Sequence, residues 1–105
     1  MSHPDIIGGV LGEVSAFYGV SIADIVSGRR TRHVLPARQA AIYLARKLSE
    51  AQPQEIGKRF GGRDYTIVLM TCRAIGRLID EDARQAALFA DLETRCRQKL
   101  LRGAC

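Results

Sequence analysis

Apolar side chains recur at intervals of three and four residues along most of this chain, which is the spacing of amphipathic α-helices. Glycine, proline and capping residues interrupt the pattern and mark where one helix ends and the next begins. No segment is marked as a strand by this pattern. It predicts an all-α protein of about six helices, at residues 6–18, 21–26, 34–48, 53–60, 64–80 and 82–101.

The helix boundaries rest on local chemistry. Gly19 ends the first segment, and Ser21 is a suitable cap for the second. Pro53 suits the first position of a helix, because the N–H that proline lacks would have no intrahelical partner there. The glycine pair 61–62 then breaks the chain before the next helix.

The length of 105 residues and the hydrophobic content of 47% suit one compact core, so the whole chain, 1–105, is predicted to be a single domain. No cationic start leads into an apolar run with a cleavage site. No stretch approaches the length of about 18 apolar residues that would indicate a membrane span. We therefore expect a cytoplasmic protein with no membrane partner.

The net charge of +5 is distributed unevenly along the chain. Residues 1–27 contain three acidic side chains and no Lys or Arg, residues 28–77 contain eleven basic and three acidic side chains, and residues 78–105 contain five of each. The basic central block favours binding to a polyanion, because phosphates neutralised by Lys and Arg release condensed counterions. Charge alone leaves open a solvated surface with no partner.

The most basic part of that block is the segment 28–33, which has three arginines in four positions, Arg29, Arg30 and Arg32, and no apolar periodicity. These features predict an exposed loop between two helices. Neighbouring guanidinium groups repel each other unless an anion lies close, so the loop is a candidate ligand contact. A solvated arginine cluster is the alternative.

Neither catalysis nor metal binding finds support in the sequence. Cys72, Cys96 and Cys105 form no CxxC pair, and the two histidines, His3 and His33, lie near the N-terminus and in the basic segment. This spacing indicates neither a zinc site nor a disulfide framework, and no cysteine has an evident histidine partner. We expect a protein that is not an enzyme and holds no metal or cofactor.

A short helix at 53–60, the glycine pair 61–62 and a second helix beginning near Asp64 have the layout of a helix-turn-helix. In such a unit the first helix braces the second, whose N-terminal end enters the major groove of DNA, about 12 Å wide. The polar residues at that end, Asp64 to Thr66, are therefore candidate readers of base edges. Helices joined by glycine also occur in proteins that bind no DNA.

Several segments carry a more specific resemblance. They are Arg29-Arg30-Thr31-Arg32, Ala37-Arg38-Gln39-Ala40, Tyr43-Leu44, Glu55-Ile56-Gly57 and Phe60-Gly61-Gly62-Arg63-Asp64-Tyr65-Thr66-Ile67-Val68. Together they resemble the C-terminal DNA-binding domain of the bacterial replication initiator DnaA over roughly residues 6–80, with 82–101 as an additional helix. The resemblance implies a Trp-repressor-like bundle that binds double-stranded DNA as a monomer. We also expect no nucleotide partner, because the sequence has no phosphate-loop motif.

The resemblance also assigns residues to the DNA. It places Arg30 in a minor groove, where a narrow A·T-rich groove attracts a guanidinium group. The residues that it implies at base edges are Arg30, Pro53, Gln54, Asp64, Tyr65 and Thr66. Those that it implies at phosphates are Arg29, Arg32, Arg38, Gln39, Lys58, Arg63 and Ile67. Asp64 has an equal alternative as a plain helix cap, which would contribute on the order of 1 kcal/mol to stability.

Departures from the family pattern change the expected function. Tyr65 and Ile67 stand where the family usually has His and Thr, so we expect a relaxed or altered site preference. The chain also has no Gly-x-x-x-x-Gly-Lys-Ser/Thr phosphate loop and no room for an ATPase domain. The departures favour a stand-alone relative of the DNA-binding domain, and a piece of a longer initiator is the alternative.

Two functions follow as hypotheses. The first is a sequence-biased binder of duplex DNA at the nucleoid, acting in replication initiation, its regulation or transcription. The second is a protein-interaction module that keeps the fold with reduced DNA binding and uses the segment 82–101 for partner helices. If that segment paired between two chains, Leu88, Leu92 and Leu101 would form the dimer seam.

Overall fold

The computed structural model describes residues 5–103, and all regular secondary structure in that range is helical. The six helices are α1 (Ile6–Tyr18), α2 (Ile22–Ile25), α3 (Val34–Leu48), α4 (Pro53–Arg59), α5 (Tyr65–Glu81) and α6 (Ala83–Gly103). The predicted all-α class and helix order are confirmed, and each boundary agrees with its prediction within about two residues.

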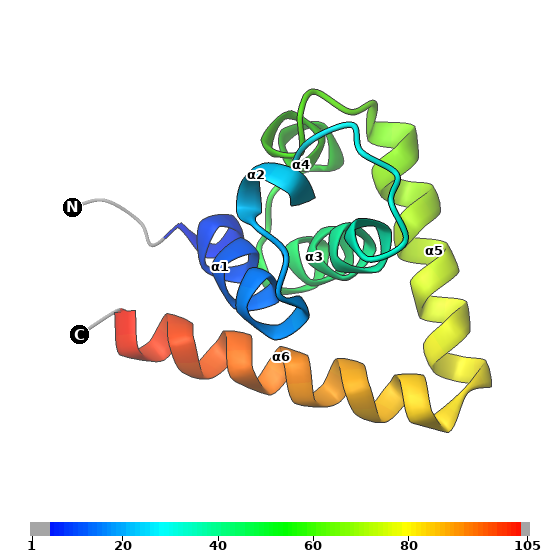
Figure 1. Cartoon of the computed structure of the whole chain (residues 1–105). Coiled ribbons are helices and arrows are strands. Elements are labelled where there is room, and N and C mark those ends of the chain that lie inside the picture. The colour runs from blue at the N-terminus through cyan, green and yellow to red at the C-terminus, as the bar shows by residue number, and fades with distance from the viewer. Residues whose placement is uncertain (1–4, 104–105) are drawn as a thin grey trace.

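Helix α3 lies at the centre of the molecule, with the other helices arranged around it (Figure 1). Four of its eight buried residues are alanines, Ala37, Ala40, Ala41 and Ala45, so α1 and α5 pack close to its backbone. Each of the other helices, or the residue that follows it, adds larger side chains to the same core. The fully buried ones include Val10, Val14, Ile25, Ile56, Phe60, Val68 and Leu92.

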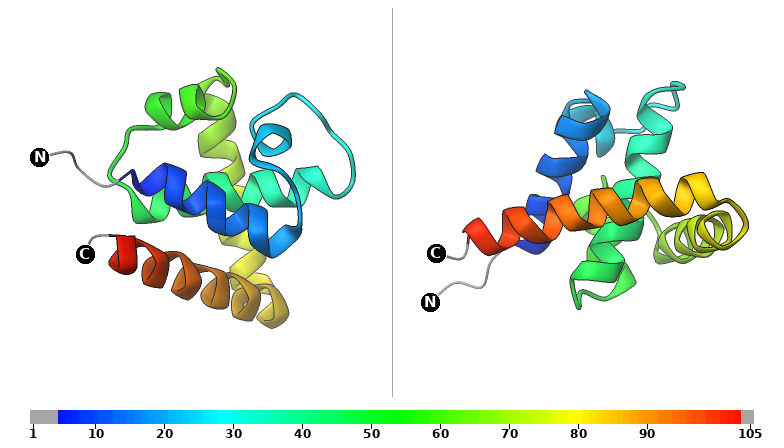
Figure 2. Two further views of the ribbon diagram at one scale, coloured as in Figure 1. Left: turned by 60° about the vertical axis from the view of Figure 1, so that its left-hand side comes forward. Right: turned by 90° about the horizontal axis from the view of Figure 1, so that it is seen from below.

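Helix α6 crosses the side of the molecule opposite to α4 (Figures 1 and 2). Phe89, Leu92 and Cys96 are buried where it meets the rest of the chain. Its C-terminal half lies against α1, where glycine permits a close approach, since a Cβ atom at Gly9 would lie 2.9 Å from Leu100 Cδ2. The additional helix is therefore an integral part of the core.

The burial of α6 corrects the predicted dimer seam. Leu92 is fully buried within its own chain and Leu88 is half-buried, while Leu101 is exposed. These leucines do not form a free stripe, and pairing through Leu92 would require α6 to leave its own core. The leucine pattern of this segment serves the fold.

One ion pair joins α6 to α3, and another joins α4 to the start of α1. Lys47 Nζ on α3 lies 2.9 Å from Glu93 Oε1 on α6. Arg59, the last residue of α4, binds the Asp5 carboxylate through two hydrogen bonds of 3.0 and 2.9 Å. Asp5 also caps α1 at Gly8 N, and the hydrogen bond from Arg59 is the main reason that the pKa of its carboxyl is lowered. The sequence did not single out Arg59 for this role.

If α6 belongs to the core, removing its buried leucine must destabilise the whole protein. We expect Leu92→Ala to lower the free energy of unfolding by about 2–5 kcal/mol, because it removes apolar contacts and leaves a cavity. Urea denaturation followed by circular dichroism measures this change. The control is Leu101→Ala on the exposed side of the same helix, which should change stability by less than about 0.5 kcal/mol. Equal, small effects of both variants would show that α6 is an appendage.

Candidate nucleic-acid interface

Helices α4 and α5 form the predicted helix-turn-helix. Phe60 is fully buried after the last residue of α4, and Gly61 and Gly62 turn the chain with φ angles of 81° and 77°. Glycine adopts this left-handed region without the steric cost that other residues meet. Asp64 then caps α5, because its Oδ1 atom accepts a 3.0 Å hydrogen bond from Thr66 N. The capping role weighed for Asp64 is therefore observed.

A glycine inside α4 sets the distance between the two helices. Arg63 N donates a 2.9 Å hydrogen bond to Gly57 O. A Cβ atom at position 57 would lie 2.1 Å from Arg63 O, which is closer than two such atoms can approach. The backbone leading into α5 therefore rests directly on the backbone of α4.

Four consecutive carbonyl groups at the end of α2 accept hydrogen bonds from two arginines. These carbonyls belong to Asp24, Ile25, Val26 and Ser27. Arg38 on α3 binds the first two, through Nη2 at 3.1 Å and Nε at 2.7 Å. Arg63, in the turn before α5, binds the last two, through Nη1 at 3.4 Å and Nη2 at 2.6 Å. A helix leaves its last carbonyls without intrahelical partners, and here the guanidinium groups donate to them, alongside the N–H and hydroxyl of Ser27, which also donate to Asp24 O.

The basic loop, residues 28–33, begins directly after these carbonyls. Gly61 approaches the same point, since a Cβ atom there would lie 2.4 Å from Val26 O. Arg63 Nη1 also donates to Phe60 O inside the turn. The residues that lead into the basic loop and the start of α5 are thus held together by hydrogen bonds, although they lie more than 30 residues apart in the sequence.

A hollow of about 240 Å³ lies between the basic loop, α3 and α5. We call it the arginine hollow, because three guanidinium groups border it and none of its lining residues is acidic. Its lining residues are Arg30, Leu35, Arg38, Gln39, Ile42, Arg63, Ile67 and Thr71. This arrangement gathers positive charge from three separate parts of the sequence.

The electrostatics of the arginine hollow are unfavourable in the absence of a ligand. Burial, together with the charges of Arg63 and Arg30, lowers the pKa of Arg38, which is only 5% exposed. Burial and the charge of Arg30 likewise lower the pKa of Arg63. Both shifts mean that the surroundings disfavour these charges. An anion seated in the hollow would offset that repulsion.

The structure places the predicted contact residues in three groups. Most of them lie exposed at the surface: Arg29, Arg30, Arg32, Gln54, Lys58, Asp64, Tyr65, Thr66 and Ile67. Gln39 and Arg63 are half-buried, and Pro53 and Arg38 are buried. Pro53 starts α4, and Arg38 binds the end of α2. Both residues were predicted as DNA contacts, and the structure gives each of them a structural role in addition.

The elements that carry these exposed residues lie on one side of the molecule. The basic loop and the turn between α4 and α5 occupy the side opposite to α6 in two different views (Figures 1 and 2). Arg30 of the loop and Ile67 of α5 border the same hollow, so the two elements are adjacent in space. Arg29 in the same loop forms an ion pair with Asp24, with 3.8 Å between Arg29 Nε and Asp24 Oδ1. A ligand on this side would meet the basic loop and the start of α5 together.

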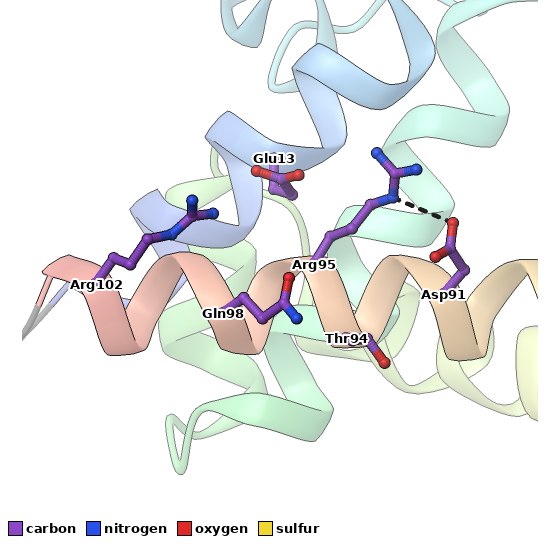
Figure 3. Close-up of a pocket in the computed structure, with 6 residues that line it drawn as sticks. All are labelled: Glu13, Asp91, Thr94, Arg95, Gln98 and Arg102. Carbon is purple, nitrogen blue, oxygen red and sulfur yellow. Dashed lines mark hydrogen bonds and ion pairs between the residues drawn. The ribbon is translucent and has the colours of Figure 1, made fainter.

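A second hollow, of about 380 Å³, lies between α1 and α6 (Figure 3). Its side chains carry both signs of charge, and Arg95 Nε donates a 3.1 Å hydrogen bond to Asp91 Oδ2 at its edge. Glu13 of α1 faces the arginines Arg95 and Arg102 of α6 across it (Figure 3). This balance of charges distinguishes it from the arginine hollow, and it lies away from the basic loop.

The described part of the chain offers no arrangement for metal chemistry. Among residues 5–103, no group of three His, Cys, Asp or Glu side chains lies close enough to hold a metal ion. Burial raises the pKa of the Cys96 thiol to about 11 and also raises the pKa of Cys72, so neither is a ready nucleophile. His3 and Cys105 lie outside the described residues. None of the helices between residues 5 and 103 combines the length and the apolar character of a membrane span.

Residues 7–75 match the family described as the bacterial dnaA protein helix-turn-helix. The chain belongs to this DnaA helix-turn-helix family. It is 46% identical over 85 residues to the chromosomal replication initiator protein DnaA of Rhodopseudomonas palustris (strain BisA53). It is 49% identical over 86 residues to the DnaA protein of Caulobacter vibrioides (strain NA1000 / CB15N).

These matches cover 81% and 82% of this chain but only 17% and 16% of the two relatives. The chain therefore spans about one sixth of the length of each initiator. The family match confirms the resemblance drawn from the sequence, and it assigns the chain to a DNA-binding helix-turn-helix that is not a catalytic domain. The family match ends at residue 75, inside α5, so the whole of α6 lies beyond it.

The close approach of α4 and α5 generates a test at Gly57. Alanine is a better helix former than glycine, so Gly57→Ala would stabilise an ordinary helix. Here we expect it to lower the free energy of unfolding by about 1–3 kcal/mol, because the new methyl group meets Arg63 O. Thermal and urea denaturation measure the change. The matched control is Gly76→Ala inside α5, where nothing lies within 4 Å of the added Cβ, and there we expect a gain of about 0.5–1 kcal/mol. If Gly57→Ala and Gly76→Ala changed the free energy of unfolding in the same direction, the close contact at Gly57 would be contradicted.

Proposed function

We propose that this protein binds double-stranded DNA by placing the first turns of α5 in the major groove and the basic loop in an adjacent minor groove. The arginine hollow carries this proposal. It joins the two elements and has three guanidinium groups without a neighbouring carboxylate among its lining residues. A phosphate of the DNA backbone between the two grooves would supply the negative charge that the lining of this hollow lacks, and its size suits the hollow.

The start of α5 has the chemistry of a base-reading surface. Asp64 accepts hydrogen bonds, as a cytosine amino group requires, and Thr66 offers a methyl group to thymine. One carboxylate oxygen of Asp64 is engaged by Thr66 N, which leaves the other oxygen for a base. Arg30 in the loop would enter the minor groove, and Arg29, Arg32 and Lys58 would contact phosphates around it.

The sequence preference is proposed to differ from that of the family as a whole. Tyr65 is 48% exposed at the position where the family usually has His, and Ile67 is 45% exposed beside the arginine hollow. Tyr65 offers apolar area and a hydroxyl in place of an imidazole. Ile67 offers no hydroxyl to a phosphate, so we expect a broader preference and weaker specific binding.

The proposed role is at DNA sites related to those of the replication initiator, in replication initiation or its regulation. The relatives are chromosomal replication initiator proteins, and the matched segment is their helix-turn-helix part. The residues of this chain include no phosphate-loop motif, so the proposed role is binding to DNA without nucleotide hydrolysis. Because its proposed ligand is chromosomal DNA, we propose that the protein acts at the nucleoid.

Fluorescence anisotropy with labelled duplexes across a salt series tests the proposal. A protein that contacts about five phosphates should lose affinity by about 10²- to 10³-fold between about 50 and 200 mM salt. Arg30→Ala should weaken binding by roughly 5- to 100-fold, because it removes the minor-groove contact. Arg102→Ala on α6, remote from this side, is the charge-matched control and should have little effect. Full affinity of Arg30→Ala, or binding that is insensitive to salt, would overturn the proposal.

A further inference from the structure

Helix α5 has a large apolar side chain on its solvent side that the proposed contacts do not use. Met70 is 60% exposed, more than Ile67 or Tyr65 on the same helix. The inward face of α5 is formed by other residues, with Val68 and Ile75 buried in the core. Met70 therefore contributes little to the packing of this fold and is available to a ligand.

The position of Met70 places it on the same stripe as the proposed base readers. Thr66 and Met70 are four residues apart, and residues at this spacing lie one above the other on a helix. The helical rise of about 1.5 Å per residue puts Met70 about 6 Å further from the N-terminal end than Thr66. That step is close to two base pairs of about 3.4 Å each.

The dimensions of the major groove admit this part of α5. The groove is about 12 Å wide and about 8.5 Å deep, and a helix with its side chains is about 10–12 Å across. A helix that lies along the groove with its N-terminal end nearest the bases carries its second turn past the base edges slightly further out than its first. Met is long and flexible, so it reaches a base edge from a position further out of the groove.

The residues around Met70 fit a DNA surface. Arg73 follows three residues later and Arg77 seven residues later, so both lie near the same stripe, and both are exposed. Neither has a carboxylate partner among residues 5–103. An apolar side chain bordered by unpaired cations suits a base edge beside a phosphate backbone.

We infer that Met70 is a further specificity-determining residue, which contacts the methyl group of a thymine one or two base pairs from those met by Thr66, with Arg73 on the neighbouring phosphate. The inference rests on the proposed binding of α5 in the major groove. It extends the reading surface from the first turn of α5 to the second. Apolar contact with the C5-methyl group is the feature that distinguishes thymine in this groove.

Selection of binding sites from a randomised duplex library, followed by anisotropy on the selected sites, tests the inference. Met70→Ala should lose the thymine preference at one position, with about a 3- to 10-fold loss of affinity for the preferred site. Met70→Leu should keep the preference, because it remains apolar. Met70→Gln should move it toward adenine, because a carboxamide pairs with the N6 and N7 atoms of that base. Arg73→Ala should reduce the dependence of DNA affinity on salt by the amount expected for about one phosphate contact, and it should leave the selected sequence unchanged.

The control is Leu78→Ala, which makes a similar apolar truncation two turns further along α5 and should leave the selected sequence unchanged. Circular dichroism should show the same melting transition for the Met70 variants and the original protein. If the original protein selects a site and both Met70→Ala and Met70→Gln select the same one, the inference is wrong and the proposed function stands. If the original protein binds no duplex, the proposed function fails and the inference fails with it.

Discussion

The interface depends on one interaction, the binding of four carbonyl groups at the end of α2 by the guanidinium groups of Arg38 and Arg63. Arg38 comes from α3 and Arg63 from the turn of the helix-turn-helix, so three separate segments meet there. The basic loop starts from this point, and the close approach of Gly61 leaves it little freedom to shift. Without this interaction, the loop and the start of α5 would be two independent surfaces. With it, they form one surface of fixed spacing.

The same interaction explains why the positive charge is concentrated rather than spread. Arg38 and Arg63 are committed to backbone carbonyls, and Arg30 approaches them from the loop with no acidic residue among the side chains that line the hollow. Burial, and in second place the charges of neighbouring arginines, lower the pKa values of Arg38 and Arg63, so their surroundings disfavour the charged forms. A phosphate in the arginine hollow would offset these charges with little further ordering of Arg38 and Arg63, because both are already held by backbone carbonyls. Affinity for a polyanion would then come largely from the loop and the hollow, and sequence preference from the first turns of α5.

The helices were predictable because their boundaries depend on nearby residues. Ser21, Gly19 and the glycine pair 61–62 act within a few positions of themselves, and the structure begins and ends its helices there. The roles of Arg38 and Arg63 were not predictable, since their partners lie 13 to 37 residues away and only the fold brings them together. The exposure of Met70 could not be predicted for a related reason. An apolar pattern shows that α5 is helical, but it does not show which of its apolar residues face the core when several sides carry them.

The central claim is that the basic loop and the start of α5 engage one duplex at the same time. Titration of the isotope-labelled protein with a duplex, followed by ¹H–¹⁵N correlation spectra, tests it most directly. We expect backbone amides of residues 28–39 and 54–73 to shift together with a single midpoint, while those on the outer side of α6 stay unchanged. Shifts confined to the loop, shifts centred on α6, or separate midpoints for the loop and α5 would contradict it.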